Sequence, residues 1–309
     1  MINVLFAGHS SRWPQYAAPL RAALAAEGLS ADPSCDHSPE TVDYIVFSPN
    51  GTLSDFTPYT RCKAVLGLWA GVETIVTNPT LTQPLTRMVD AGLREGMVEW
   101  VTGHVLRYHL GIDAQIAAQN GQWHPVTPPL ARNRRVGILG LGALGAACAQ
   151  ALRALNFDVA GWSRRPQQIP GMATHSGTDG LRTLLAHSEI VVLLLPQTPE
   201  TENTLDAQTL AMLPRGARLL NPGRGPLIDD DALLAALNSG HIAHATLDVF
   251  RTEPLPQGHP YWAHPNVTVT PHIASETRPD TASASIAENI RRCETHQPLL
   301  NQVDRAAGY

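Results

Sequence analysis

The sequence feature that most constrains the fold is the stretch "RVGILGLGALG" at residues 135–145. An apolar run that ends at Leu139 is followed by glycines with the spacing G-x-G-x-x-G and then by an Ala-rich segment. This order predicts a buried strand, a tight turn and a helix that packs back onto the strand, which is the start of a parallel βαβ unit. The glycine spacing alone is a weak signal, and the strand and helix on either side make it informative.

Each residue of the turn has a physical task in such a unit. Gly140 permits the tight turn, Gly142 lets the backbone approach a pyrophosphate, and Gly145 lets helix and strand pack closely. The first helical N–H groups, at Ala143 and Leu144, have no partners within the helix and can bind phosphates. We therefore expect a dinucleotide to bind here. The alternative is a glycine turn that binds no ligand.

The residues after the next predicted strand bear on which dinucleotide binds. An NAD site places an acid at the end of this strand, where it accepts hydrogen bonds from the ribose 2′-OH. Here the strand ends at Ser163, which Arg164 and Arg165 follow. A serine hydroxyl can donate to a 2′-phosphate and arginines can pair with it, at about 1.5–3 kcal/mol for each charged hydrogen bond. We expect NADP(H) to be preferred over NAD(H). The alternative is two solvated arginines at a strand end.

The rest of the chain alternates short β-rich runs with Ala/Leu-rich helical stretches, which predicts an α/β fold with parallel sheets. A helical stretch at residues 95–119 and a Pro-rich connector at 124–133 separate an early α/β unit from the unit with the glycine turn. A last helix, at 281–293, is expected to return to the early unit. We therefore predict a discontinuous substrate domain at 1–97 and 277–309, and a dinucleotide-binding domain at 98–276.

Composition and charge exclude several classes of partner. The 309 residues carry a net charge of −5, so a nucleic-acid or anionic membrane partner is not expected. The sequence contains neither a signal peptide nor an apolar run of about 20 residues, which a membrane span needs. The four cysteines are scattered without a CxxC pair, so we expect free thiols and no metal site. These features favour a soluble, cytoplasmic protein.

Three later motifs supply an arginine, two acids and a histidine. "NPGRG" contains Arg224, "LDVFRTEPLP" contains Asp248 and Glu253, and "TPHIA" contains His272. All three motifs lie near the ends of predicted strands, and open α/β sheets bind their ligands outside the carboxyl ends of the strands. Each residue alone also fits an ordinary role, such as a paired arginine, a turn acid or a loop histidine. Together they predict a catalytic group.

With these motifs the chain resembles the D-isomer-specific 2-hydroxyacid dehydrogenase family, and within it the glyoxylate/hydroxypyruvate reductases. The similarity extends along the whole chain and includes "LWAGVET", "LLLPQTPET" and "NQVDRAAGY". It implies two α/β domains, a Rossmann domain for the cofactor and a smaller flavodoxin-like domain for the substrate. It also implies a homodimer.

The resemblance assigns catalytic roles that the chemistry supports. Arg224 is expected to hold the substrate carboxylate and polarise the C2 carbonyl. His272 is expected to protonate the carbonyl oxygen as a general acid. Glu253 is expected to hydrogen-bond the other ring nitrogen and raise the pKa of the imidazole. Asp248 is expected to meet the nicotinamide end of the cofactor.

The resemblance also implies binding residues and shows one departure. The cofactor cleft is expected to be lined by Leu195, Pro196, Pro222 and Gly223. Backbone N–H groups of Ala70 and Gly71 are expected to bind the substrate carboxylate. Many family members have an arginine where this chain has Gly67 and a glycine where it has Trp69, so a second cation is not expected there. Trp69 and Trp262 could narrow the pocket for small acids, or could be ordinary core residues.

The expected activity is the NADPH-dependent reduction of a small 2-oxo acid, such as glyoxylate or hydroxypyruvate. The sequence does not identify the physiological substrate. Formate oxidation on the same scaffold is disfavoured, since formate dehydrogenases of this superfamily pair the histidine with Gln instead of Glu. Two alternatives stay open: oxidation of phosphite or another small anion, and a regulatory protein that senses dinucleotides.

Overall fold

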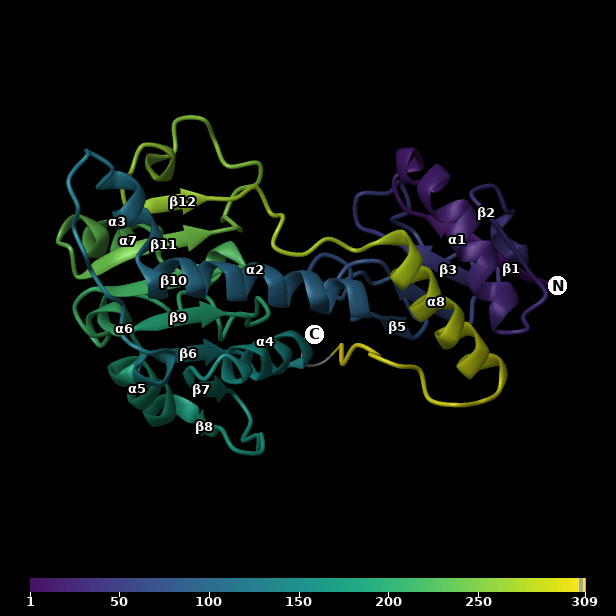
Figure 1. The fold of residues 1–309 in the computed structure, drawn as a ribbon. Helices are drawn as coiled ribbons and strands as arrows, with labels where there is room; N and C mark the ends of the chain where they lie inside the picture. The colour runs from purple at the N-terminus through teal and green to yellow at the C-terminus, as the bar shows by residue number, and fades with distance from the viewer. Residues whose placement is uncertain (306–307, 309) are drawn as a thin grey trace. The chain divides into compact units, whose positions relative to one another are not determined.

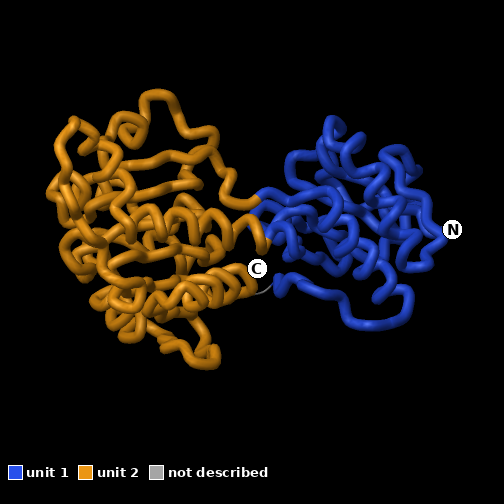
Figure 2. Tube along the Cα trace, in the orientation of Figure 1, with its two compact units in different colours: residues 1–93, 276–309 blue, residues 94–275 orange. Residues whose placement is uncertain are grey.

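The computed structural model describes residues 1–305 and residue 308, and the chain divides into two compact units (Figure 2). The first comprises residues 1–93 and 276–309, and the second comprises residues 94–275. The divisions fall close to the expected positions 97 and 277. Part of the "NQVDRAAGY" stretch lies outside the described residues. The assignment of one unit to the substrate and the other to the cofactor stays a prediction.

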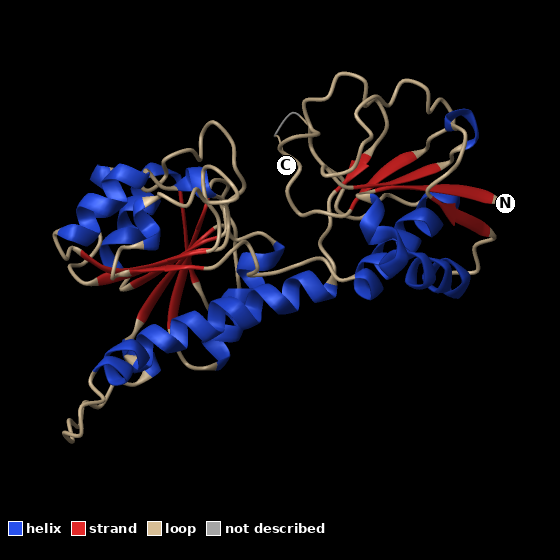
Figure 3. Cartoon of the chain, turned by 90° about the horizontal axis from the view of Figure 1, so that it is seen from above, coloured by secondary structure: helices blue, strands red, loops and turns tan. Residues whose placement is uncertain are grey.

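The first unit contains a parallel five-stranded sheet in the order β2-β1-β3-β4-β5, which is the flavodoxin-like order. Helices α1 and α8 pack on one face, where Leu20 and Ile286 join the core, and loops cover the other face (Figure 3). The elements are β1 (Ile2–Ala7), α1 (Trp13–Ala26), β2 (Ala31–Ser34), β3 (Tyr44–Phe47), β4 (Ala64–Gly67), β5 (Leu85–Thr86) and α8 (Pro279–Glu294).

The second unit contains a parallel seven-stranded sheet in the order β12-β11-β10-β9-β6-β7-β8 (Figure 1). Numbered within the unit, this is the Rossmann order with one further strand at an edge, and it matches the domain type that the family resemblance implied. The strands are β6 (Arg135–Leu139), β7 (Asp158–Ser163), β8 (Ala173–Ser176), β9 (Ile190–Leu193), β10 (Ala217–Asn221), β11 (Ile242–Leu247) and β12 (Val267–Val269). The helices are α2 (Ala91–Leu110), α3 (Ile112–Ala117), α4 (Ala143–Ala154), α5 (Gly177–His187), α6 (Ala207–Ala211) and α7 (Asp230–Asn238). The first three residues of α2 belong to the first unit.

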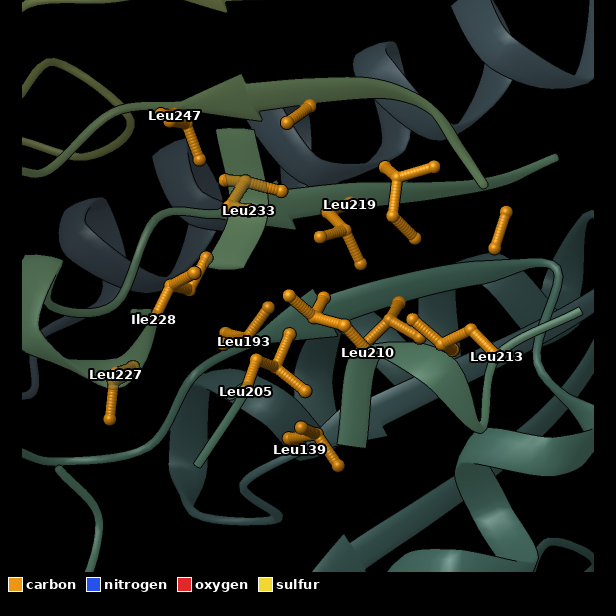
Figure 4. Packing of buried hydrophobic residues seen from close by; sticks show 14 of the residues in the cluster. Leu139, Leu193, Leu205, Leu210, Leu213, Leu219, Leu227, Ile228, Leu233 and Leu247 are labelled. Carbon is orange, nitrogen blue, oxygen red and sulfur yellow. The ribbon is translucent and has the colours of Figure 1, made fainter. Parts of the chain in front are cut away.

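Two apolar layers bury the faces of this sheet. On one face, Leu139, Leu193 and Leu219 pack against residues such as Leu210 and Leu233 from the covering helices (Figure 4). On the other face, α2 and α4 cover the sheet. Because both faces are buried, the strands read as nearly continuous apolar runs, and the loops at the ends of the strands are left to carry the polar site residues.

The helix expected at residues 95–119 differs from the structure. Instead, α2 ends at Leu110 and α3 begins at Ile112, since Gly111 has φ +66° and breaks the helix between them. Strand β2 was not predicted from the sequence, and it contains Pro33. A proline is tolerated there because β2 is an edge strand.

Candidate active site

The expected cofactor and catalytic residues of the second unit follow six parallel strands. All strands of this sheet run parallel, so their carboxyl ends lie at one edge. The order of the strands reverses between β6 and β9, which is the switch point where such sheets bind ligands. The residues that follow these strand ends are Gly140, Gly142, Ala143, Leu144, Gly145, Arg164, Arg165, Leu195, Pro196, Pro222, Gly223, Arg224, Asp248 and His272.

The structure requires two of the three glycines of the turn and leaves the third unexplained by packing. Gly140 has φ +105°, and a Cβ there would lie 2.5 Å from the carbonyl oxygen of Leu194. A Cβ on Gly145 would lie 1.8 Å from the carbonyl oxygen of Gly140. Gly142 has φ −70°, and a Cβ there would meet no described atom within 4 Å. Neither backbone strain nor internal packing therefore explains Gly142, and this fits a backbone that a pyrophosphate approaches closely.

The start of helix α4 also suits an anion. Gly142 is its N-cap, and among the described residues no side chain caps the helix and no acid occupies its first turn. The N–H groups at Ala143 and Leu144 therefore keep their capacity to bind phosphate oxygens.

The "SRR" turn has an internal hydrogen bond. Ser163 is buried, and its hydroxyl donates to the carbonyl of Arg165 at 2.7 Å. The guanidinium of Arg164 lies 3.9 Å from the Glu200 carboxylate, and Arg165 is exposed. Ser163 thus shapes the turn that carries the arginines. A hydrogen bond from this hydroxyl to a 2′-phosphate stays a prediction, and it requires release of the Arg165 carbonyl.

Glu253 and His272 form the central pair of the site. Nδ1 of His272 lies 2.7 Å from Oε2 of Glu253, and Oε1 of Glu253 accepts from the amide of Phe250 at 2.9 Å. The hydrogen bond to Glu253 raises the pKa of His272, against burial, which lowers it. Burial raises the pKa of Glu253, but hydrogen bonds from His272 and the Phe250 amide bring that pKa below its ordinary value. The pair therefore favours a carboxylate beside an imidazolium.

Asp248 anchors the loop that carries His272. Its side chain is 0% exposed. Oδ1 accepts from the Thr270 hydroxyl at 2.6 Å and the Ile273 amide at 2.9 Å, and Oδ2 accepts from the Ala274 amide at 2.8 Å. The Asp248 carbonyl accepts from the His272 amide at 2.8 Å. This anchoring role was missed from the sequence, which pointed only to a contact with nicotinamide, and that contact stays a prediction.

Arg224 lies in a loop that Asn221 closes. The amide nitrogen of the Asn221 side chain donates to the Arg224 carbonyl at 2.9 Å, and its oxygen accepts from the Gly223 amide at 3.1 Å. Nη1 of Arg224 donates to the Gly223 carbonyl at 2.6 Å. Sequence reasoning did not single out Asn221, although it begins the "NPGRG" motif.

In the first unit, Trp69, Ala70 and Gly71 follow the end of β4. Trp69 is 44% exposed, and in the second unit Trp262 is 52% exposed. The alternative that these tryptophans are core residues is therefore wrong, and their contact with substrate stays a prediction.

A Cβ on Gly67 would lie 2.6 Å from the Thr86 carbonyl oxygen. Backbone packing thus leaves no room here for the arginine that many family members carry.

A glycine turn at the switch point of a Rossmann sheet, with a carboxylate-bound histidine at the same edge, is the arrangement of a nicotinamide-dependent dehydrogenase. The sequence model "D-isomer specific 2-hydroxyacid dehydrogenase, NAD binding domain" matches residues 104–274, more than half of the chain. The chain belongs to this family of oxidoreductases, which use a dinucleotide of the NAD(P) type.

Among characterised relatives, glyoxylate/hydroxypyruvate reductase A of Serratia proteamaculans is 43% identical over 257 residues, which are 81% of this chain and 82% of that protein. A D-isomer specific 2-hydroxyacid dehydrogenase from Xanthobacter autotrophicus Py2, solved with NADPH and MES, is 44% identical. It superimposes with a TM-score of 0.92 over 100% of this chain and 99% of that one. The NADPH-dependent glyoxylate/hydroxypyruvate reductase of Sinorhizobium meliloti, solved with NADP and sulfate, is 32% identical, with a TM-score of 0.87 and 100% of both chains covered.

Two further observations concern the described part of the chain. Its helices include none that is long and apolar enough to cross a bilayer. Its His, Cys, Asp and Glu side chains form no group of three or more that could hold a metal ion.

Proposed function

We propose that this protein reduces small 2-oxo acids, such as glyoxylate and hydroxypyruvate, to the 2-hydroxy acids with NADPH. The observation that carries the proposal is the 2.7 Å hydrogen bond between Glu253 and His272 at the sheet edge that also carries Arg224 and the glycine turn. The names of the Serratia and Sinorhizobium relatives support the choice of substrate.

The reduced nicotinamide, when bound, supplies the hydride that C2 accepts. Arg224 binds the substrate carboxylate and draws charge from the C2 carbonyl, since its planar fork suits both oxygens. His272 donates a proton to the carbonyl oxygen as that oxygen gains charge. Glu253 keeps its carboxylate on Nδ1, so the opposite ring nitrogen is left for the substrate and the imidazolium is stabilised.

The preference for NADPH rests on the end of β7. Ser163, Arg164 and Arg165 stand where an NAD site has an acid. The Xanthobacter and Sinorhizobium structures contain NADPH or NADP, which supports the same preference. Changing Arg164 and Arg165 together to Ala should raise KM for NADPH far more than KM for NADH, and equal losses with both cofactors would contradict the assignment.

A matched assay tests the activity. NADPH or NADH oxidation is followed with glyoxylate, hydroxypyruvate, pyruvate and phenylpyruvate, and NADP+ or NAD+ reduction is followed with phosphite. Turnover with NADPH and glyoxylate or hydroxypyruvate is the expected result. Turnover of phosphite alone would replace the proposed substrate. Tight NADPH binding without any turnover would favour a dinucleotide-sensing regulatory protein.

A homodimer is the assembly we propose, in the cytoplasm. Its support in this chain is a group of large apolar side chains that are exposed within a short stretch around α3. Trp123 is 93% exposed, and several large apolar side chains exposed along one stretch of chain favour an interaction site. The other members of this group are Leu110, Ile112, Ile116, Val126 and Leu130.

A further inference from the structure

The side chain of Arg251 joins two segments of the candidate active site. It leaves the main chain two residues before Glu253 and reaches the segment that follows Arg224. Its Nη2 donates to the Ile228 carbonyl at 2.8 Å and lies 3.4 Å from the Pro226 carbonyl oxygen. Arg251 therefore links the chain around Glu253 to the chain after Arg224.

The same guanidinium also contacts side chains from two other segments, residues 202–203 and the start of α7. Nη2 also donates to Oδ1 of Asn203, and Nη1 lies 3.3 Å from the Glu202 carboxylate. Its Nε lies 3.7 Å from the carboxylate of Asp230 at the start of α7. A planar fork with five donors can serve carbonyls and carboxylates at once, which the single ammonium of a lysine cannot do.

The main chains of the two segments also touch directly. A Cβ on Gly225 would lie 2.0 Å from the carbonyl carbon of Phe250 and 2.4 Å from the amide nitrogen of Arg251. The segment after Arg224 therefore packs against the Phe250–Arg251 peptide with no room for a side chain. A change in one segment displaces the other.

Two hydrogen bonds connect Phe250 to the catalytic pair. The amide of Phe250 holds Oε1 of Glu253 at 2.9 Å. The other oxygen of Glu253 holds His272 at 2.7 Å. The Phe250 amide belongs to the Val249–Phe250 peptide, which directly precedes the Phe250–Arg251 peptide that packs against Gly225. The position of the Phe250 main chain therefore sets where the carboxylate meets the imidazole.

We propose that Arg251 is a positioning residue, which fixes the placement of the Glu253–His272 pair relative to Arg224. This inference rests on the proposed function, in which these three side chains act on one substrate. Arg251 does not touch the reacting atoms and acts through the main chain of its neighbour Phe250, whose amide binds Glu253.

The side chain of Arg251 is 32% exposed, and ion pairs at such sites contribute little to stability. Arg251→Ala is therefore expected to fold and to act mainly on the geometry of the site. Arg251→Lys keeps the charge but loses the fork. Arg182→Ala is the matched control, because Arg182 pairs with Asp179 one helical turn away on α5 and the pair is exposed.

Two measurements test the proposal. The first is an NMR titration of the His272 imidazole, assigned with a His272→Ala variant. The charged groups that act on this imidazole are Glu253, Asp248 and Arg224, and all three are kept in the variants. We expect the pKa of His272 to fall in Arg251→Ala, to fall less in Arg251→Lys, and to stay unchanged in Arg182→Ala.

The second measurement is steady-state reduction of glyoxylate with NADPH. In Arg251→Ala, kcat should fall by about tenfold to a hundredfold, as expected for a misplaced catalytic group, with a smaller change in KM for NADPH. An unchanged His272 pKa together with an unchanged kcat in folded Arg251→Ala would overturn the proposal. If Arg251→Ala does not fold, the same criteria apply to Arg251→Lys and Glu202→Gln. The titration needs no substrate, so the two proposals can fail separately. If the wild-type protein reduced no 2-oxo acid but the His272 pKa were lower in Arg251→Ala than in the wild type, the proposed function would be refuted and the role of Arg251 would still be supported.

Discussion

At the scale of single residues, the site depends on how a loop histidine is held. His272 has φ +55°, a conformation that is uncommon for residues other than glycine. Asp248 holds the loop on the main-chain side, and Glu253 holds the ring. The imidazole is therefore held in place before any substrate binds, and its protonated form is favoured by Glu253.

The charge of His272 gives a prediction about pH. Glu253 raises the pKa of His272 in the folded protein, so the protonated acid is kept up to that raised pKa and lost as the pH rises through it. Reduction rates should accordingly fall on the alkaline side of the profile. In Glu253→Gln the pKa of His272 should fall, and the alkaline limb of kcat/KM should move to lower pH. A limb at the same pH in both proteins would show that another group controls it.

Asp248 gives a prediction about both stability and activity. In Asp248→Asn an amide NH₂ faces the donors on Thr270, Ile273 and Ala274, so at least one buried donor loses its acceptor. The free energy of unfolding should fall by about 1–3 kcal/mol, and kcat should fall because the His272 loop loses its anchor. Chemical denaturation measures the first effect, with exposed Asp179→Asn as the control. Equal stability of both variants would contradict the anchoring role.

Residue types and spacing, together with the family resemblance, led to the prediction of Arg224, Glu253 and His272 as catalytic residues, because each lies in a recognisable motif. The structure brings Glu253 and His272 together, and the catalytic roles stay a prediction. The contacts of Asp248 and Arg251 could not be predicted in this way. Both depend on which loops the fold brings together, and residues 248 and 270–274 are far apart in sequence. The sequence shows a carboxylate but not which donors surround it.

At the scale of the elements, the β6–turn–α4 unit separates glycines that the fold requires from one that it does not. An added Cβ at Gly145 would collide with backbone, whereas one at Gly142 would meet no described atom within 4 Å. Gly145→Ala should therefore lower the melting temperature, since overpacking costs about 1–3 kcal/mol. Gly142→Ala should melt like the wild type yet bind NADPH more weakly. Unchanged NADPH affinity in Gly142→Ala, measured by calorimetry, would contradict close approach of the cofactor at this residue.

The elements that were predicted correctly have long and regular apolar patterns. The missed elements are short or carry residues that disfavour them. Strand β8 is only four residues, "ATHS", with no fully buried position, and α6 spans only Ala207–Ala211. The start of α6 is set by a capping box between Asp206 and Thr209. This is a local signal that the apolar pattern does not show.

At the scale of the whole molecule, each unit has its own sheet and its own apolar clusters. The order of strands in both sheets follows the two α/β types that the family resemblance implied, and the sequence alone showed only the alternation of strands and helices. Assembly lies beyond that pattern, because it depends on which surfaces are left exposed.

The exposed apolar stretch around α3 gives a prediction about assembly. The native mass, measured by light scattering after size exclusion, should correspond to two chains. Trp123→Asp should shift this mass toward one chain, because a charge in the centre of an interface is costly to bury. Trp262→Asp is a control at another exposed tryptophan. A single-chain mass for the wild type would contradict the proposed homodimer.

The central claim is that the Glu253–His272 pair drives reduction of a small 2-oxo acid by NADPH. Its most direct test is kcat for glyoxylate with NADPH in the wild type and in His272→Ala, with NADPH affinity measured in both. The account predicts turnover in the wild type, a loss of about 10²- to 10⁴-fold in the variant, and little change in NADPH affinity. A His272→Ala enzyme with wild-type kcat would contradict the account.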